Sequence, residues 1–547
     1  MTVVTPLSDA FLKEKENFSK FGKIIQRVPD DLEDKLNEAF EKRKNQILNT
    51  ESEWKLGENG VVRYVSSTDG DDSNDGLSPE TPWKTIEKIH EAQRNKTVRA
   101  GDVVLFKRGD EWHGKMITDI GITYSAYGVG AKPRLLASTA ANLTEDWHIT
   151  DVEGVYRFKD VFDYTRDVGN IVFNDGECYG QRVAKSLDED VSLPAGSDYI
   201  VSNGINKWPF PPREFKSYKE LAKIAFDIPE SDLMYYHDRE SGELFLYSRK
   251  GNPAECFSSI ELCTKGHGIV GKSNVVIDNL CIKYSGSHGV RAKNCSDFTV
   301  RNCEIGFIGG SFMVPTSLAR FGNAVELYGT TDGYYVYNNY IYQCFDCGPT
   351  VQWTGELSEG EIKIAKNIEF YGNALCEGAL EVWFTPRNPT TETAYAKLIN
   401  CKLYDNMVTG SGTGWKAYNH QKQEWCAFFG GRETTAEYTD CYIEDNYFWG
   451  ERRHLIKSVP TTTKNGNGFN WRNNIIIHPL NEGSIGYLGE NSAIGKGAPK
   501  QFWYSEKAVT KLVENGTFDK NYFYYTDGDE KNRRKLVDKK VKLFDLD

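Results

Sequence analysis

The sequence lacks the two features that would place a protein in or across a membrane. No stretch reaches the ~18 consecutive apolar residues of a membrane-spanning helix. The first residues, MTVVTPLSDAF, lack the basic start and the apolar run of a secretory leader. We therefore expect no membrane partner and a cytoplasmic location, or a secreted one if a leader has been removed.

Basic charge is also in short supply. The 547 residues contain 66 Lys plus Arg against 78 Asp plus Glu, which gives a net charge of −12. A nucleic-acid binder needs a basic surface for phosphates, so this balance argues against a nucleic-acid partner. The 30 Tyr, 28 Phe and 12 Trp are too many for a disordered chain and indicate a folded protein.

The twelve cysteines indicate buried thiols rather than bridges or metal ligands. A chain of this length buries enough apolar surface to fold without disulfide bonds. Cysteines such as Cys303 and Cys401 lie inside strand-like runs, where a thiol acts as a small apolar side chain. Cys344-x-x-Cys347 has no second pair at zinc-binding spacing. We expect neither a metal nor a cofactor.

Two regions differ in their hydrophobic pattern. Residues 7–50 carry apolar residues three to four apart, which predicts two amphipathic helices separated by a break at Pro29. Beyond residue 60 the pattern changes to short strands and turns, with short helices predicted at residues 82–95 and 217–225. We expect an N-terminal helical segment, residues 1–58, that caps or flanks a β-rich domain of residues 59–547.

A unit of the form apolar-x-apolar-x-Asn-x-x-apolar recurs along the β-rich region. Its first two copies, VVIDNLCI and FTVRNCEI, are 23 residues apart, and later copies are spaced more widely because loops are inserted. An Asn at the same turn of each copy can hydrogen-bond to the next, and Asn tolerates the positive φ of such turns. The central residues are Asn279, Asn302, Asn338, Asn373, Asn406, Asn446, Asn473 and Asn521.

This periodicity predicts an all-β fold, a parallel β-helix in which the short strands of each coil stack on those of the next. A β-sandwich or a propeller is the alternative, which the drifting spacing and the missing blade motif disfavour. Residues 235–251 alternate around a Ser-Gly turn and predict a β-hairpin. Together with residues 140–234 they indicate a β-rich insertion near 140–255.

Three short motifs open the β-rich region: YVS at 64–66, GDDSNDGLSPETPWKTI at 70–86 and AGDVVLFKRGD at 100–110. They resemble the first coil of right-handed parallel β-helix proteins that act on carbohydrates, the pectate-lyase-like superfamily. The resemblance implies a right-handed β-helix and a glycan substrate, but members include lyases, glycosidases, epimerases and phage tailspikes, so it leaves the reaction open. The lacto-N-biosidase type, whose β-helix is also accompanied by helical segments, is the most similar. Its paired catalytic aspartates are not matched here, where Asp346 alone is an obvious candidate.

The acidic residues of segment 69–80 fall at the offsets of a calcium-binding EF-hand loop. Asn74 stands where that loop requires a Gly, and no helix precedes the segment. The alternative is a series of Asx turns that begin the first coil.

Four central strands place polar residues on one face when they are aligned by their apolar alternation. The aligned triplets are Val290-Arg291-Ala292, Val325-Glu326-Leu327, Val351-Gln352-Trp353 and Leu380-Glu381-Val382, so the outward column reads Arg291, Glu326, Gln352, Glu381. Adjacent coils lie about 4.8 Å apart, so the two glutamates would be about 9–10 Å apart, with Asp346 between them. A slip of two residues would re-pair the carboxylates but keep them on the same face.

Paired carboxylates at such distances are the machinery of glycoside hydrolysis. Inverting enzymes hold their two carboxyl groups ~6.5–9.5 Å apart and retaining enzymes ~5–5.5 Å apart. Glu326 with Glu381 fits the first arrangement, and Asp346 with either glutamate fits the second. Because like charges raise one of the two pKa values, one carboxyl can serve as general acid. We predict that Asp346, as acid or nucleophile, acts with Glu326 or Glu381.

The side chains around this column predict a sugar site. Aromatic rings stack on the apolar faces of sugars, and Arg can clamp hydroxyls or a carboxylate. Segments 384–398 and 408–415 resemble loops that wall a groove, and a closed pocket would favour exo action on short oligosaccharides. The predicted substrate-binding residues are Arg291, His288, Gln352, Trp353, Trp383, Arg387, Trp415 and His420. Trp353 and Trp383 have opposite phases, so both cannot point outward.

These observations predict a glycoside hydrolase that acts on an oligosaccharide and needs no cofactor. Two alternatives stay open. A polysaccharide lyase or epimerase would use Arg291 or His288 on a uronate and would need calcium to offset the acidic column. A non-catalytic carbohydrate-binding β-helix would need none of the carboxylates.

Overall fold

The computed structural model describes residues 25–27, 29–184, 200–201, 217–222, 233–312, 320–388, 390–411, 426–430, 436–450, 454–457, 469–480, 518–519 and 522–527. Over these residues the chain is mostly β, with parallel sheets and few helices, which confirms the predicted class. No helix in this part of the chain has the length and apolarity needed to cross a lipid bilayer.

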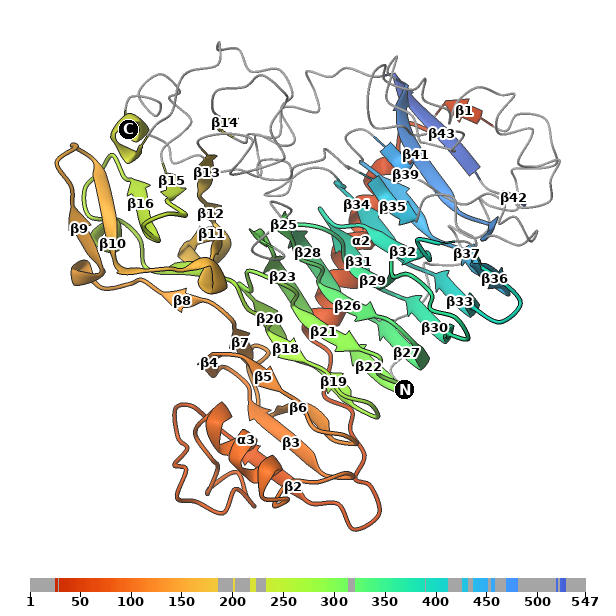
Figure 1. The fold of residues 1–547 in the computed structure, drawn as a ribbon, viewed down its shortest axis with the longest axis horizontal. Coiled ribbons are helices and arrows are strands. Elements are labelled where there is room, and N and C mark those ends of the chain that lie inside the picture. Colours follow the sequence, from red (N-terminus) through yellow and green to blue (C-terminus); the bar gives the residue numbers. More distant parts are fainter. Residues whose placement is uncertain are drawn as a thin grey trace.

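Three long parallel sheets, here called A, B and C, make up most of the described molecule (Figure 1). In spatial order, sheet A contains β1 (Ile25–Arg27), β43 (Tyr522–Asp527), β41 (Ile475–Leu480), β38 (Tyr447–Trp449), β34 (Met407–Thr409), β31 (Ala374–Cys376), β28 (Tyr340–Cys344), β23 (Glu304–Ile308), β20 (Cys281–Lys283), β7 (Arg134–Leu136) and β4 (Glu111–His113). Sheet B contains β2 (Val62–Val65), β3 (Val103–Lys107), β6 (Thr123–Tyr127), β19 (Val276–Asp278), β22 (Phe298–Arg301), β27 (Thr331–Tyr337), β30 (Ile362–Tyr371), β33 (Tyr395–Tyr404), β37 (Tyr442–Glu444), β40 (Asn470–Arg472) and β42 (Phe518–Asp519), with β36 (Glu437–Thr439) also paired to β33. Sheet C contains β39 (His454–Lys457), β35 (Cys426–Gly430), β32 (Leu380–Phe384), β29 (Pro349–Trp353), β26 (Val325–Tyr328), β21 (Val290–Lys293), β18 (Ile269–Val270) and β5 (Met116–Ile117).

The chain visits these sheets in rotation. From β19 to β34 the order is B, A, C, so that each round adds one strand to each sheet. Because side chains alternate along a strand, every second residue points to a core shared by the three sheets. Ile277 of sheet B, Ile282 of sheet A and Val290 of sheet C meet in this core and are fully buried. Each round therefore contributes inward side chains from three strands to the core, and each of these strands also presents a row of side chains outward.

An asparagine ladder joins successive rounds at the corner between sheets B and A. Each ladder Asn is fully buried, and from the second one onward its Oδ1 accepts from the backbone N–H and Nδ2 of the ladder Asn in the round before. The predicted stacking of Asn side chains is confirmed, but not every predicted Asn takes part in it: in some rounds the ladder residue is the Asn that directly follows the predicted one. The predicted Asn338 and Asn473 instead hold the positive φ that precedes the ladder residue, at 52° and 57°. The ladder itself consists of Asn339, Asn373, Asn406, Asn446 and Asn474.

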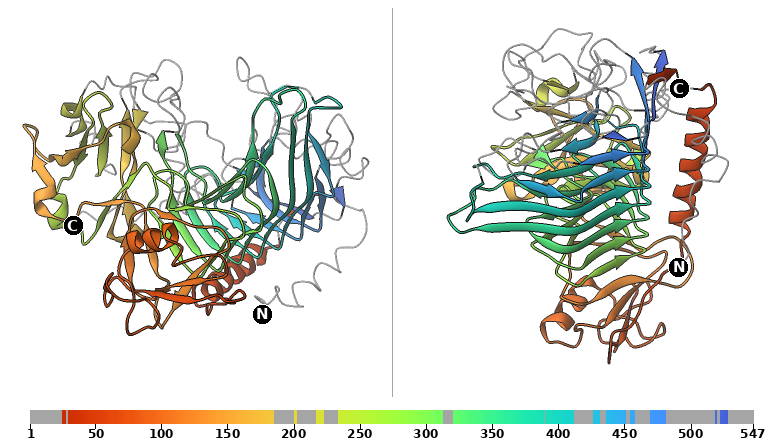
Figure 2. Two further views of the ribbon diagram at one scale, coloured as in Figure 1. Left: turned by 60° about the horizontal axis from the view of Figure 1, so that its bottom comes forward. Right: turned by 90° about the vertical axis from the view of Figure 1, so that its right-hand side faces the viewer.

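Helix α2 (Leu32–Leu48) runs along the outer side of sheet A (Figure 2). Its apolar stripe, which includes Leu36 and Phe40, packs against Met407 and Trp449 of that sheet. The other predicted N-terminal helix falls largely outside the described residues, and its last part, Ile25–Arg27, is a strand. The end of the core beside β2 and β3 is covered instead by α3 (Ile86–Arg94), which buries Ile86 and Ile89 there.

An excursion between β7 and β18 forms two further sheets. One contains β9 (Trp147–Ile149), β10 (Val155–Val161), β13 (Gln181–Ala184), β14 (Ile200–Val201), β15 (Met234–His237) and β16 (Glu243–Tyr247). The other contains β8 (Thr139–Ala140), β11 (Val168–Phe173), β12 (Cys178–Tyr179) and β17 (Ile260–Thr264), with the short helix α5 (Pro253–Cys256) before β17. The predicted hairpin is confirmed, since β15 pairs with β16 in antiparallel register.

Asp167 ties this excursion to the rounds that follow. Its carboxylate accepts from His237 Nδ1 at 3.0 Å, from the Phe312 backbone N–H at 2.8 Å and from Arg320 Nη1 at 3.1 Å. Phe312 and Arg320 belong to the antiparallel pair β24 (Ser311–Phe312) and β25 (Arg320–Phe321), which lies immediately before β26. The excursion therefore supports the chain at the entrance to a central strand of sheet C.

Segment 69–80 is a series of side-chain-capped turns. Asp71 accepts from the Ser73 backbone N–H at 2.8 Å, and Asp75 accepts from the Leu77 N–H at 3.0 Å and from Thr81 Oγ1 at 2.8 Å. These contacts are the Asx turns considered as the alternative to a calcium loop.

Candidate active site

The outer face of sheet C carries the polar column that the sequence predicted, with one change of register. Arg291 lies opposite Glu326, as expected, but Glu326 lies opposite Thr350 rather than Gln352. Thr350 in turn lies opposite Glu381. The column therefore reads Arg291, Glu326, Thr350, Glu381, and the two glutamates remain two strands apart, about 9–10 Å between their backbones.

Gln352 lies two residues further along β29, in a second outward column. That column reads Lys293, Tyr328, Gln352, Trp383. From this position the Gln352 Nε2 donates to Glu381 Oε2 at 2.5 Å. The predicted column position of Gln352 is wrong by two residues, and its role in substrate binding stays a prediction.

Glu381 is a carboxyl group held in its neutral form. Its side chain is only 2% exposed. Burial raises the pKa of Glu381 to about 8, and the negative charge of Asp346 adds to the rise, while the hydrogen bond from Gln352 acts against it. Asp346 lies in the turn between β28 and β29, where its backbone N–H donates to Gly322 O at 3.0 Å. A proton donor and a neighbouring carboxylate therefore share one corner of the face.

Glu326 is 3% exposed, and its Oε2 contacts His288 Nε2. His288 Nδ1 accepts from the backbone N–H of Asn323 at 3.0 Å. Because an amide N–H can only donate, Nδ1 carries no proton, and the proton of the neutral imidazole is on Nε2. The protonated Nε2 of His288 therefore faces the carboxylate of Glu326 within ion-pair distance.

A ladder of side chains at the corner between sheets A and C holds His288 in place. The His288 backbone N–H donates to His267 Nδ1 at 3.3 Å, and the two rings stack with centroids 5.3 Å apart. One round further on, Asn323 Oδ1 accepts from the Cys347 backbone N–H at 3.0 Å. Each side chain thus binds the backbone of the next round, and Cys347 is the residue directly after Asp346.

The sequence did not single out His267, Asn323 or Thr350, and it pointed to Cys347 only as half of a possible metal-binding pair. The ladder leaves one signal in the sequence, the recurrence of His-Gly followed by a branched residue at 267–269 and again at 288–290. Thr350 was missed because the register was shifted by two.

The predicted sugar-binding tryptophans Trp353 and Trp383 point to opposite sides of sheet C, as their positions in the alternating strand pattern require. Trp353 points into the shared core, 6% exposed, and packs against Phe384, so its predicted role in sugar binding is wrong. Trp383 is half-buried on the outer face and packs against Cys347 and Ala379. Of these two tryptophans, Trp383 is the one that can meet a sugar on the side of Glu381.

The remaining predicted residues lie apart from this cluster or outside the described chain. Arg387 follows β32 and is exposed, with its backbone N–H donating to Gly355 O. Arg291 is half-buried at the β21 end of the column. Trp415 and His420 lie outside the described residues. Among the described residues, no group of three or more His, Cys, Asp or Glu side chains is arranged to hold a metal ion.

Comparison with known proteins gives short or distant similarities. No protein-family model matches the sequence. A stretch of 77 residues, 13% of this chain, is 36% identical to a lacto-N-biosidase of Bifidobacterium longum subsp. longum and covers 5% of that enzyme. A structure of XylC with xylose has 11% identity and a TM-score of 0.42, over 78% of this chain and 66% of that one. A lacto-N-biosidase from Eubacterium ramulus has 11% identity and a TM-score of 0.35, over 82% of this chain and 63% of that one. Function therefore has to be argued from the site itself.

Proposed function

We propose that the chain is a carbohydrate-active enzyme, a glycoside hydrolase, in which Glu381 is the general acid and Asp346 the second carboxylate. In this proposal the three sheets form a right-handed parallel β-helix of the pectate-lyase-like kind, and the outer face of sheet C binds an oligosaccharide. The short match to a lacto-N-biosidase supports a glycan substrate.

The observation that carries the proposal is the raised pKa of Glu381, about 8, beside the charge of Asp346. A carboxyl group that keeps its proton at neutral pH can protonate the oxygen of a leaving sugar. A neighbouring carboxylate that stays charged can attack the anomeric carbon or activate water. This division of roles is what hydrolysis of a glycosidic bond requires.

Asp346 suits the second role better than Glu326. Asp346 is half-buried, whereas Glu326 is almost fully buried and in contact with His288. A carboxylate that interacts strongly with Glu381 is a close neighbour, and closely spaced carboxyl groups are typical of retaining enzymes. We therefore expect retention of the anomeric configuration, whereas inversion would assign the second role to Glu326.

The surroundings of Glu381 suit a short sugar chain. Trp383 and Tyr328 lie in the adjoining column and offer aromatic faces. The deep burial of Glu381 and Glu326 favours a closed site and exo action, which releases one product from a chain end.

The test is hydrolysis of a panel of aryl glycosides and neutral oligosaccharides, with product configuration followed by NMR. Glu381→Gln and Asp346→Asn should each lower kcat by about 1,000-fold or more, because each removes a group that acts in the transition state. Glu437→Gln is the matched control, since Glu437 is a carboxylate of sheet B paired with Lys397 at 2.9 Å. Full activity in Glu381→Gln, or an unsaturated product typical of a lyase, would overturn the proposal.

A further inference from the structure

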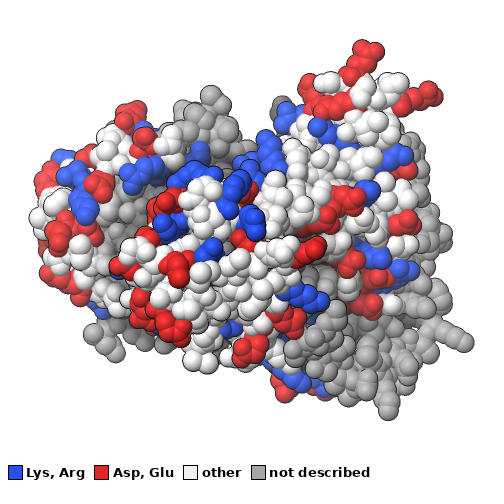
Figure 3. Space-filling view, turned by 90° about the horizontal axis from the view of Figure 1, so that it is seen from below, with Lys and Arg blue, Asp and Glu red and all other residues white. Residues whose placement is uncertain are grey.

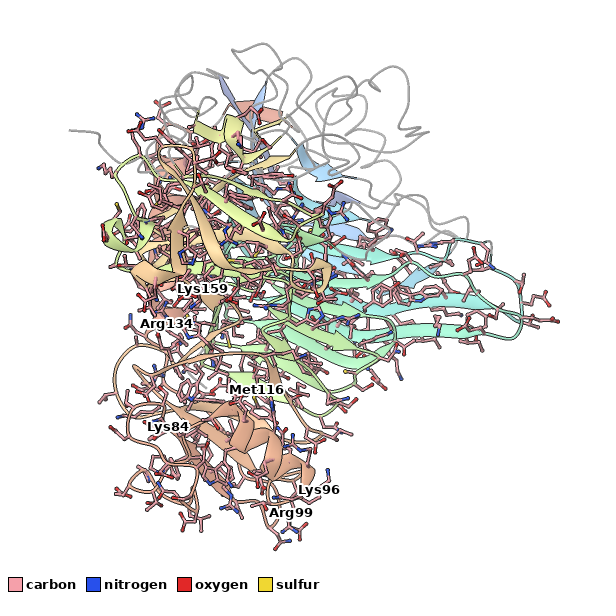
Figure 4. All side chains as sticks on the ribbon, turned by 60° about the vertical axis from the view of Figure 1, so that its left-hand side comes forward. Lys84, Lys96, Arg99, Met116, Arg134 and Lys159 are labelled. Carbon is pink, nitrogen blue, oxygen red and sulfur yellow. The ribbon has the colours of Figure 1, made fainter. Side chains whose placement is uncertain are left out.

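The β21 end of the same face carries positive charge. Arg291 and Lys293 alternate along β21 with the buried Val290 and Ala292, so both point outward, next to Glu326 and Tyr328. Lys115 precedes β5, the end strand of sheet C whose first residue, Met116, is labelled in Figure 4. Here Arg291 and Lys293 of β21, together with Lys115 two strands away, are called the cationic end.

Arg291 differs from the other arginines whose side chains the structure describes. Those that are buried or half-buried have a hydrogen-bond, ionic or ring partner, as Arg301 has in Asp278 at 3.0 Å. Arg291 is half-buried, its Nε is buried without a hydrogen-bond partner, and no carboxylate in the described chain lies within ion-pair distance. Glu326 faces it across the sheet, but Glu326 is held by His288.

The unpartnered guanidinium is unusual in this protein because acidic residues outnumber basic ones. Acidic and basic side chains are interspersed over the face seen in Figure 3. Lys96, at the α3 end of the molecule in Figure 4, is paired with Asp119 at 3.0 Å. Taking a guanidinium partly out of water without a partner costs free energy, and a bound anion would offset this cost.

Positive charge also acts on the corner ladder at this end. His267, stacked on His288, has its pKa lowered to about 3 by burial, by His288 and by the nearby charges of Arg291 and Lys115. Each of these charged groups, like Lys265, therefore lies near His267. His267 is neutral at physiological pH and adds no further positive charge.

We propose that the cationic end is an anion subsite, in which Arg291 with Lys293 and Lys115 binds a carboxylate or sulfate group carried by a sugar residue of the substrate. The inference rests on the proposed function, because it assigns an acidic oligosaccharide to the same face. A planar guanidinium matches both groups by paired hydrogen bonds.

The position of the subsite separates this proposal from a uronate lyase. Arg291 lies three strands from Glu381, about 14 Å along the sheet. The anionic group therefore lies away from the bond beside Glu381, whereas a lyase needs its uronate at the cleaved bond. The acidic sugar selects the substrate and does not take part in the chemistry.

The experiment compares three matched oligosaccharides: a neutral one, one with a terminal uronate and one with a sulfate ester. Binding is measured by calorimetry and turnover is measured separately, each at low and high salt, with the full chain. We expect the anionic forms to bind about 10- to 100-fold more tightly than the neutral form, with the preference falling as salt rises. The better of the two anionic probes identifies the group.

Arg291→Met keeps the apolar stem and should abolish this preference, while Arg291→Lys should keep part of it. The control is Lys397→Met, which removes a paired cation of sheet B and should leave the preference intact. Equal binding of all three probes, binding of none, or an unchanged preference in a folded Arg291→Met variant would overturn the subsite. If only the neutral probe is hydrolysed, the anion subsite is refuted but the hydrolase proposal stands. If the anionic probes bind preferentially but no probe is hydrolysed, the hydrolase proposal is refuted but the anion subsite stands.

Discussion

Replacing Asn339 by Ala should destabilise the protein far more than replacing its neighbour Asn338 by Gly. The Asn339 side chain is fully buried and forms three hydrogen bonds. Its Nδ2 donates to Val300 O and to Asn373 Oδ1, both at 3.0 Å, and its Oδ1 accepts from the Cys303 N–H at 2.9 Å. Asn338 instead occupies a positive φ of 52°.

The expected magnitudes follow from these contacts. A buried hydrogen bond contributes about 1 kcal/mol net, and a buried polar group left without a partner costs about 1–3 kcal/mol. Asn339→Ala removes three bonds and takes a partner from a buried amide and a buried carbonyl, so the free energy of unfolding should fall by about 3–5 kcal/mol. Asn338→Gly should change it by less than about 1 kcal/mol, because Gly adopts a positive φ without steric strain.

Urea unfolding followed by circular dichroism measures both changes against the unmodified protein. Asn339→Ala should move the midpoint to clearly lower urea, and Asn338→Gly should leave it nearly in place. Equal losses in the two variants would refute the division between the ladder position and the turn position. A larger loss for Asn338→Gly would show that Asn338 belongs to the ladder.

Three further outcomes concern the proposed site. Because a raised pKa keeps Glu381 protonated below about 8, kcat/KM should fall as pH rises through that value; a rate that stays constant to pH ~10 would contradict the acid role. His288→Ala should lower kcat by about 10-fold or less, since it disturbs Glu326 and not the proposed pair of Glu381 and Asp346, and a loss as large as that of Asp346→Asn would assign the second role to Glu326. Trp383→Ala should raise KM while stability changes by less than about 1 kcal/mol, whereas Trp353→Ala should cost about 3–5 kcal/mol in urea unfolding. If Trp353→Ala instead raised KM and Trp383→Ala destabilised the protein, Trp353 would be the sugar-binding residue and Trp383 the core residue.

The alternation of apolar residues was enough to predict parallel β structure and the polar face, but not its register. Strand patterns repeat every two residues, so Val351 fits equally well opposite Val325 or opposite Leu327. In the structure Val351 lies opposite Leu327. The choice is stabilised by the turn before the strand, where the Cys347 N–H binds Asn323 Oδ1. Because that hydrogen bond joins two different rounds, the apolar pattern of one strand cannot predict it.

The sequence also could not show which of two adjacent Asn residues joins the ladder, or that an isolated histidine belongs to the site. Asn338 and Asn339 have the same chemistry, and only the path of the turn decides which side chain enters the ladder. His267 was missed because a lone histidine carries little information until its neighbour in the next round is known. The paired carboxylates could be found because charge repeated on one strand face is not expected from packing alone.

The pairing of β1 with β43 and the packing of α2 have a consequence for how the molecule opens. Neighbouring rounds are joined by ladder residues 34, 33, 40 and 28 positions apart, so most of the protein can form progressively along the chain. The α2 contacts, by contrast, join residues 362 and 412 positions apart. They can form only after the late rounds exist. Because α2 packs on strands of sheet A from several successive rounds, these rounds cannot separate until the helix is released, and the lifetime of the native state should depend on a helix on another sheet than the proposed catalytic face.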